Sequence, residues 1–454
     1  VYYQEDSSTR PEHLTFDPRR LEINEYLEQP LHQFARGQSA QSTVDPELKD
    51  SMRRCESCHS IEATHDWLPY KERHTSALSC ESCHIPEMYS NALQQLDWTV
   101  INPDLTPQSD CRGIEGDPNS LNSLITGFQP VLMPRQEVDG EIKLAPHNLI
   151  TSWFWVYGDP PRPVRLEDLQ AAWLEGEDYH PDIISTFDLD ENGQLEVSEL
   201  LIDTPEKQAL IAAQLAVLGL ENPRIVGEIQ PYSINHNVTH GEWATQDCQS
   251  CHSQDSLIYQ PFQLAGYIPG DVMPEFVQDS NTVDRGELVV DTGGSLYYQP
   301  LAHDEDFYIL GRDRVNWVDL FGSLVFLGVV VGISAHAGLR LWATIRQRNG
   351  NGKPETKMVY MYGLYERLWH WLQTFVILLL IFTGLIIHRP DTFGIFSFRY
   401  VVQVHNIMAA ILVMNATLAL FYHLTSGEIK QYIPKPRGFF DQAIVQATFY
   451  FKGI

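Results

Sequence analysis

Three long apolar segments near the C-terminus constrain the fold of this 454-residue chain more than any other feature. They are Trp317–Ala343, Leu368–Ile387 and Tyr400–Leu424, and each is close to the roughly 20 residues that a helix needs to cross the hydrocarbon of a bilayer. Backbone polar groups in lipid must be satisfied within the segment itself, so such runs fold as helices. The sequence therefore predicts a membrane domain over residues 317–454 with at least three transmembrane helices.

Charge is distributed unevenly on either side of this boundary. Of the 31 Lys/Arg and 59 Asp/Glu, residues 1–316 hold 19 and 53. The connection after the first apolar segment carries five basic residues, whereas the next connection carries Arg389 and Arg399. Because basic loops stay in the cytoplasm, we expect residues 1–316 to form an extracytoplasmic domain, exported by a leader that is cleaved or lies outside the sequence. Its acidity would repel nucleic acid and attract cationic partners.

The pentapeptide Cys-x-x-Cys-His occurs three times and contains all but one of the seven cysteines. This pattern is the attachment signature of c-type haem, in which two thiols form thioethers with the porphyrin and the histidine binds iron. A zinc ribbon made from the first two pairs is the alternative, but zinc would not require a histidine after every pair. We predict three covalent c haems. Their residues are Cys55, Cys58 and proximal His59; Cys80, Cys83 and proximal His84; and Cys248, Cys251 and proximal His252.

Each iron also takes a sixth ligand, unless an open position serves catalysis. Outside the motifs and the C-terminal part of the chain, nine histidines remain: His13, His32, His65, His74, His147, His180, His236, His240 and His303. We favour His74, six residues before Cys80, with His147 and either His240 or His236 for the others, because proximity in sequence makes them easy to bring to iron. The seventh cysteine, Cys111, is either an idle thiol or an unusual haem ligand.

The segment 188–199, DLDENGQLEVSE, matches the calcium-binding loop of an EF-hand position by position. Helical patterns flank it, with LEDLQAAWLEG before and VSELLIDTPEKQALIAAQLAVLGL after. The alternative is an acidic turn that resembles the loop by chance. We predict a structural Ca²⁺ site. Its ligands would be Asp188, Asp190, Asn192, the carbonyl of Gln194 and bidentate Glu199.

Histidines within membrane segments are costly and mark functional sites. His370 and His388 are 18 residues apart, as are His405 and His423, so each pair shares one helix face about 27 Å apart along the axis. In antiparallel helices His370 would approach His423 near the cytoplasm, and His388 would approach His405 near the outer surface. We predict two bis-histidine b haems; the alternative is that these histidines anchor helix ends at the interface.

The strings RLWHW, VHN and FYHL resemble the di-haem cytochrome b subunits of the thiosulfate reductase, formate dehydrogenase and hydrogenase type. The resemblance covers about 90 residues and implies electron exchange between quinone and a partner, with later helices supplying some haem ligands. His370 and His405 match its most recognisable positions. Residues 1–316 are more loosely similar to multihaem cytochromes c, including the octahaem tetrathionate reductase type, and this similarity implies electron transfer.

Together these patterns predict a mainly α protein: a loop-rich tri-haem domain over residues 1–316 with an EF-hand, followed by a transmembrane bundle that we expect to continue beyond residue 454. The predicted function is electron transfer in the bacterial inner membrane between quinone and other subunits of a respiratory complex or an extracytoplasmic carrier. One alternative is an enzyme that reduces or oxidises a small sulfur or nitrogen compound at a c haem. Another is a calcium-controlled assembly subunit. Phosphate-binding loops and hydrolase motifs are absent from the sequence.

Overall fold

The computed structural model describes most of the chain as two compact units. The first unit holds the described residues up to Cys251 together with Asp255–Phe307, and the second holds His252–Gln254 and the described residues from Tyr308 onward. The described residues are 55–57, 59–118, 120, 122–137, 140–176, 178–277, 282–301, 307–348, 363–431, 433 and 438–452.

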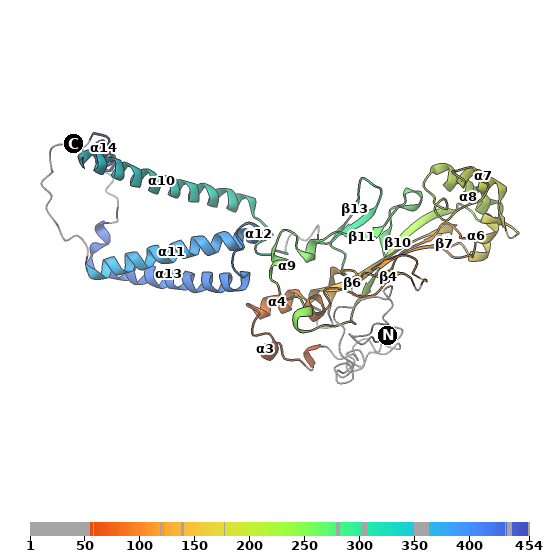
Figure 1. The fold of residues 1–454 in the computed structure, drawn as a ribbon, viewed down its shortest axis with the longest axis horizontal. Helices are drawn as coiled ribbons and strands as arrows, with labels where there is room; N and C mark the ends of the chain where they lie inside the picture. Colours follow the sequence, from red (N-terminus) through yellow and green to blue (C-terminus); the bar gives the residue numbers. More distant parts are fainter. Residues whose placement is uncertain are drawn as a thin grey trace. The chain divides into compact units, whose positions relative to one another are not determined.

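A twisted sheet organises the first unit (Figure 1). Its longest strand, β6 (Ile142–Tyr157), pairs in parallel with β1 (Ala92–Trp98) and antiparallel with β10 (Arg224–Ser233) and β5 (Val131–Gln136). Three shorter strands complete the sheet, namely β2 (Gln108–Arg112) beside β1, β7 (Arg162–Pro163) beside β6 and β12 (Glu275–Phe276) beside β10.

The prediction that the N-terminal region is mainly α was wrong, because this unit is mixed α/β. The run of β6 that ends in ITSWFWVY is rich in β-branched and aromatic residues, which favour strands. Six consecutive residues of β6, Leu144–Leu149, are buried, so this part of the strand is covered by protein on both faces. A strand buried on both faces lacks the alternation that identifies a half-exposed one, and our prediction had assigned this apolar content to haem burial instead.

Three helices pack together beyond one end of the sheet (Figure 1). They are α6 (Leu166–Trp173), α7 (Pro181–Phe187) and α8 (Pro205–Val217). The ring of Trp173 meets that of Phe187 edge to face at 5.1 Å between centroids, and both rings belong to the core that also includes β6. This core is made of apolar side chains from the sheet and the helices.

Short elements complete the first unit. The smaller sheets are β11 (Phe262–Ala265), β14 (Leu296–Gln299) and β13 (Glu287–Val290); β3 (Ile114–Glu115) and β4 (Leu124–Ile125); and β8 (Leu174–Glu175) and β9 (Asp178–Tyr179). The short helices are η3 (Cys55–Ser57), α3 (Ile61–Thr64), α4 (Lys71–Ala77), α5 (Cys80–His84), η4 (Gly241–Trp243), α9 (Gln249–His252), η5 (Leu257–Tyr259) and η6 (Pro269–Asp271).

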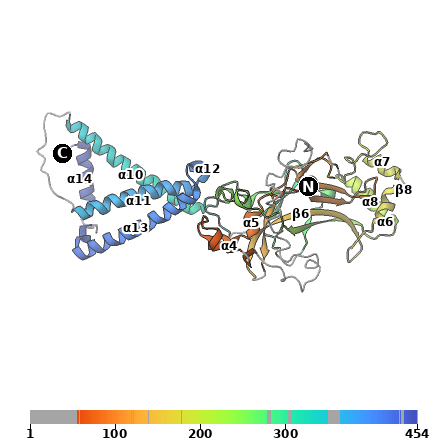
Figure 2. The same ribbon diagram turned by 60° about the horizontal axis from the view of Figure 1, so that its bottom comes forward.

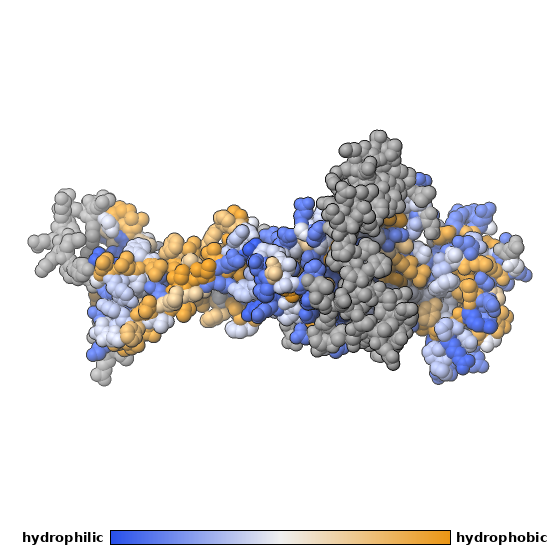
Figure 3. Space-filling model, turned by 90° about the horizontal axis from the view of Figure 1, so that it is seen from below, coloured by the Kyte–Doolittle hydropathy of each residue, from blue (hydrophilic) through white to orange (hydrophobic). Residues whose placement is uncertain are grey.

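The second unit contains three helices, among the described residues, that are long and apolar enough to cross a membrane, as predicted. They are α10 (Asn316–Arg348), α11 (Leu364–His388) and α13 (Phe398–Ser426). Helices α11 and α13 lie side by side in Figures 1 and 2 and run antiparallel. Apolar side chains dominate the visible face of the membrane helices in Figure 3. The shorter helices are α12 (Pro390–Phe393), η7 (Glu428–Gln431) and α14 (Phe439–Lys452).

Candidate functional site

The second Cys-x-x-Cys-His motif forms helix α5 and is fastened to the central sheet. The backbone N–H of Ser79 and the hydroxyl of Ser82 both donate to the carbonyl of Leu144 on β6, at 2.9 and 2.6 Å. Glu81, the variable residue after the first cysteine, is buried with its carboxylate 3.8 Å from Arg135. The motif therefore has a fixed position on a rigid strand.

The other two motifs gather around the second one. The backbone N–H of Thr239 donates to the carbonyl of His84, and that of Thr245 donates to the carbonyl of Cys83, which brings the chain to the third motif beside α5. Burial raises the pKa of the Cys251 thiol to about 12, and neighbouring Cys83 adds to the rise. A hydrogen bond with Cys55 is the main cause of the raised pKa of Cys80, so the first motif also lies beside α5. Cys58 lies outside the described residues.

Three of the four cysteines in the first two pairs, Cys55, Cys80 and Cys83, are among the described residues. Among the described residues, the one group of three or more histidine, cysteine or carboxylate ligand atoms within 4.8 Å of one another is made of carboxylates. Burial also raises the pKa of the Cys83 thiol to about 11. The seventh cysteine, Cys111, lies on β2 opposite Leu93, and its pKa is raised by burial and by Asp110.

Two motif histidines have the tautomer that an iron ligand needs. Nδ1 of His84 donates to the carbonyl of Thr239, and Nδ1 of His252 donates to the carbonyl of Leu310, both at 2.7 Å. A hydrogen bond from Nδ1 to a carbonyl places the lone pair on Nε2, which is the usual arrangement around a metal-bound imidazole. These residues therefore fit a covalently attached haem. His59, the histidine of the first motif, is exposed.

His252 belongs to the second unit, where it packs on residues that flank the membrane helices. Its ring stacks on Phe398, the first residue of α13, with centroids 5.1 Å apart and planes inclined by 23°. Gly311 has φ +93°, and a Cβ atom added there would lie 2.7 Å from the carbonyl oxygen of His252. Only glycine combines that conformation with that approach, so the segment around residue 311 is shaped to accept His252.

The predicted distal ligands have different surroundings. Nδ1 of His74 lies 3.2 Å from the carbonyl of Tyr70 on its own helix, and His236 and His240 are exposed. His147 is fully buried on β6, with Nδ1 2.9 Å from the carbonyl of Ala145 and Nε2 2.9 Å from the hydroxyl of Ser233. With both ring nitrogens engaged by the protein, this arrangement argues against the prediction that His147 binds iron.

One histidine that the sequence reasoning did not favour lies beside a motif histidine. The ring of His65 is 5.9 Å from that of His84 between centroids, with the two planes at 84°. Burial, His84 and Lys71 lower the pKa of His65, which favours the neutral imidazole. Its position six residues after His59 is the signal in the sequence that could have identified it as a ligand candidate.

The predicted calcium loop brings three of its carboxylates together. Ligand oxygens of Asp188, Asp190 and Glu199 lie within 4.8 Å of one another. The loop closes on itself through backbone donors: Gly193 N–H to Asp188 at 2.7 Å, and Leu189 N–H to Glu199 at 2.7 Å.

The helices that flank this loop differ from those of an EF-hand. The incoming helix α7 is short, and α8 begins at Pro205, six residues after Glu199, so no helix leaves the loop directly. The chain instead makes a turn here, in which the Gln194 N–H donates to the side-chain oxygen of Asn192 at 2.7 Å. The geometry of the carboxylates is compatible with a cation.

The four predicted membrane histidines lie on α11 and α13. Nδ1 of His405 is 2.9 Å from the hydroxyl of Thr383, and His405 lies beside Gly384, whose absent side chain leaves room there. The Thr383 hydroxyl donates its proton to the carbonyl of Leu379 at 2.7 Å, so it accepts from His405. That bond leaves the Nε2 lone pair of His405 available to iron.

The remaining three histidines have different exposure. His423 is buried, with its ring 5.9 Å from that of Trp369, the neighbour of His370 in sequence. His370 and His388 are exposed on α11. His405 thus lies at the level of Thr383, five residues before His388 in the chain, and His423 lies at the level of Trp369.

The comparison with protein families covers this part of the chain. Residues 361–454 match the family model described as prokaryotic cytochrome b561. The C-terminal region is a cytochrome b561 domain. Such a domain implies electron transfer through b haems in a membrane, in agreement with the three apolar helices and the tautomer of His405. No curated protein and no solved structure matches the chain.

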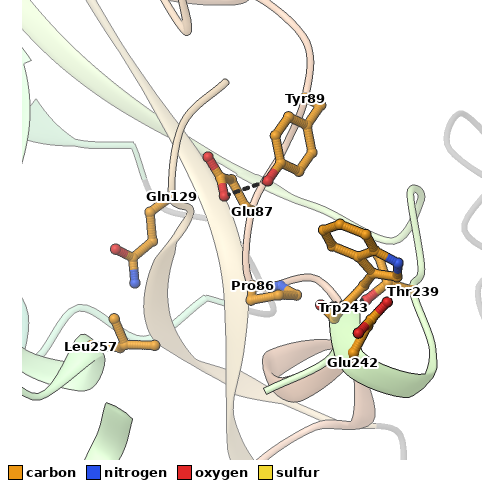
Figure 4. A pocket seen from close by; sticks show the side chains of 8 residues that line it. All are labelled: Pro86, Glu87, Tyr89, Gln129, Thr239, Glu242, Trp243 and Leu257. Atoms are coloured by element: carbon orange, nitrogen blue, oxygen red, sulfur yellow. Dashed lines mark hydrogen bonds between the residues drawn. The ribbon is translucent and has the colours of Figure 1, made fainter. Parts of the chain in front are cut away.

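Beside the motifs of the first unit, outside the cytochrome b561 domain, lies a cavity of about 360 Å³ (Figure 4). Its lining includes Pro86, Glu87 and Tyr89, which follow the second motif, together with Thr239, Glu242 and Trp243. The Tyr89 hydroxyl donates to Glu87 at 2.8 Å. Thr239 is the residue whose carbonyl fixes His84, so the cavity adjoins the motif cluster although none of the predicted site residues is in its lining.

Proposed function

We propose that this protein transfers electrons between the membrane quinone pool and an extracytoplasmic redox partner, with two b haems in the cytochrome b561 domain and three c haems at the Cys-x-x-Cys-His motifs. The gathering of these motifs is the observation that carries the proposal. The thiol of Cys80 forms a hydrogen bond with Cys55, Cys251 neighbours Cys83, and two peptide N–H groups fasten the segment before the third motif to the second motif. Electron carriers must lie close together, and a chain of haems is the simplest reason for this clustering.

The residues of the chain would have distinct roles. Cys55 and Cys58, Cys80 and Cys83, and Cys248 and Cys251 would attach the porphyrins, while His59, His84 and His252 bind iron from one side. Haem iron supplies a centre that gains or loses one electron. The carbonyls of Thr239 and Leu310 hold two of these imidazoles in the ligating tautomer, and such partners also tune the potential of the metal.

In the membrane, His370 and His405 would bind b haems, with His388, His423 or later helices completing the ligand sets. The basic connections support a position of residues 1–316 outside the bacterial inner membrane. Because residues 1–316 have 19 basic and 53 acidic residues, they would attract a positively charged carrier by long-range electrostatics. A partner subunit of a respiratory complex is compatible with the same surface.

We also propose that Ca²⁺ binds the loop 188–199 as a structural ion. The carboxylates of Asp188, Asp190 and Glu199 converge, and their mutual repulsion would be relieved by a divalent cation. The loop sits between α7 and the core residue Leu200, so the ion would stabilise the helical end of the first unit.

The test is haem counting followed by a redox titration of the purified full-length protein. Pyridine haemochrome spectra should give three c haems for every two b haems, and reduction by a quinol should reach both classes. Absence of covalent haem would refute the role of the three motifs. Absence of haem c reduction by quinol, with the c haems present, would refute the path through the membrane domain.

A further inference from the structure

The ring of His65 stands beside the ring of His84, the proximal histidine of the second motif. Their centroids are 5.9 Å apart and their planes are almost perpendicular, at 84°. Two metal–imidazole bonds of about 2 Å each place the centroids of histidines on opposite sides of one metal about 6 Å apart. The observed separation matches that expected for two rings sharing one iron.

The hydrogen bonds of His65 fix its tautomer. The hydroxyl of Thr64 donates its one proton to the carbonyl of Ser60 at 2.8 Å, so it can only accept from Nδ1 of His65, also at 2.8 Å. His65 consequently carries its proton on Nδ1 and its lone pair on Nε2. His84 has the same tautomer because its Nδ1 donates to Thr239. Both rings thus present the nitrogen that binds iron.

Both rings are held by well-fixed backbone. His65 caps the C-terminus of α3, where its N–H donates to the carbonyl of Ile61 at 3.0 Å and its carbonyl accepts from Leu68 at 3.0 Å. His84 ends α5, which is fastened to β6 through Ser82. A side chain on such anchors keeps its distance to the metal without a large loss of rotamer entropy.

We infer that His65 is the distal ligand of the haem attached by Cys80 and Cys83, opposite His84. This inference rests on the proposed function because it requires the second motif to carry haem. It replaces His74, the residue favoured by sequence proximity, whose Nδ1 lies against the carbonyl of Tyr70. Since His65 follows the first motif, the segment that leaves one haem would complete the next, and the second iron would carry electrons without an open position for substrate.

The test uses the full-length holoprotein and its His65→Ala variant. In the wild type we expect a low-spin haem c with the highly anisotropic EPR signal that perpendicular imidazole planes produce. In the variant, that signal should disappear, one of the three c haems should become high-spin, and added imidazole should restore the low-spin state. His74→Ala, on α4, is the matched control and should leave the signal unchanged.

The outcomes separate this inference from the function on which it rests. Three c haems that all stay low-spin in His65→Ala would overturn the assignment while leaving the function intact, as would a high-spin haem produced by His74→Ala alone. A wild type without haem c would overturn both. If His65→Ala does not fold, His65→Met decides: a methionine ligand should keep the haem low-spin, raise its potential and add a sulfur-to-iron absorption band, whereas an unchanged spectrum overturns the inference.

Discussion

His252 stacks on Phe398 with their ring centroids 5.1 Å apart and their planes 23° from parallel. Phe398 is the first residue of α13, and His405 follows seven residues later on the same helix. Seven residues make two turns, so Phe398 and His405 share one face about 10 Å apart along the axis. A motif histidine thus packs on the helix that carries His405, the proposed haem b ligand, and one helix face connects the two.

Replacing Phe398 with alanine should slow electron exchange between the b and c haems several-fold. The substitution removes a buried ring that fixes the imidazole of His252, so the third c haem would be held less firmly. Stopped-flow spectroscopy after mixing with quinol measures this: haem b reduction should keep its rate while haem c reduction lags. Phe421→Ala, at an exposed position on the same helix, is the control. Equal haem c rates in all three proteins would contradict the role of the stacked pair.

Thr383→Val should weaken the binding of one b haem about 10- to 100-fold, the usual cost of losing a hydrogen-bond partner of a metal-ligating histidine. Valine matches threonine in shape but cannot accept from Nδ1 of His405. Haem transfer to excess apomyoglobin measures the affinity. Thr417→Val removes a hydroxyl that bonds only to a helical carbonyl, that of Val413, and should retain its haem. Equal retention in the two variants would show that Thr383 does not hold the ligand.

The membrane helices were predictable because length and apolarity alone decide whether a segment crosses a bilayer. The Cys-x-x-Cys-His spacing singled out the motif histidines as candidates, and two of them have the tautomer that a metal ligand needs. The partnership of His65 with His84 was not, since it depends on how α3 and α5 pack after the chain turns between them. The same limit applies to β6, whose register with β10, such as Phe154 opposite Val226, joins residues far apart in sequence.

Glu199→Gln should abolish stabilisation of the protein by calcium. A ligand present at a hundred times its dissociation constant stabilises the folded state by about 2.7 kcal/mol, so the wild type should melt at a higher temperature with Ca²⁺ than with a chelator. Glutamine keeps the size of Glu199 but removes the charge that meets Asp188 and Asp190. Scanning calorimetry provides the measurement, and Glu206→Gln, exposed on α8, is the control. A wild-type melting temperature that is the same with Ca²⁺ and with the chelator would refute the site.

Asp97 should make the first unit less stable as the pH rises from about 4 to about 6. Its carboxylate is fully buried on β1 and accepts hydrogen bonds from the N–H of Thr99 at 2.8 Å and from the hydroxyl of Tyr267. Burial nevertheless raises its pKa to about 6, above the roughly 3.9 of an unfolded aspartate. The unfolded chain therefore ionises first, and stability is fully present below about pH 4 and declines until the folded carboxyl also ionises, by roughly 3 kcal/mol in total.

Asp97→Asn should remove this decline because the amide stays neutral at every pH. Relative to the wild type, we expect the variant to gain in melting temperature between pH 4.5 and pH 7, as followed by calorimetry. Asp110→Asn, at an exposed position opposite Gln95 on the neighbouring strand β2, is the matched control and should show no such gain. A difference in melting temperature between Asp97→Asn and wild type that stays constant across this pH range would mean that Asp97 keeps the same charge in the folded and unfolded states. The burial of Asp97 beside Tyr267 argues against that outcome.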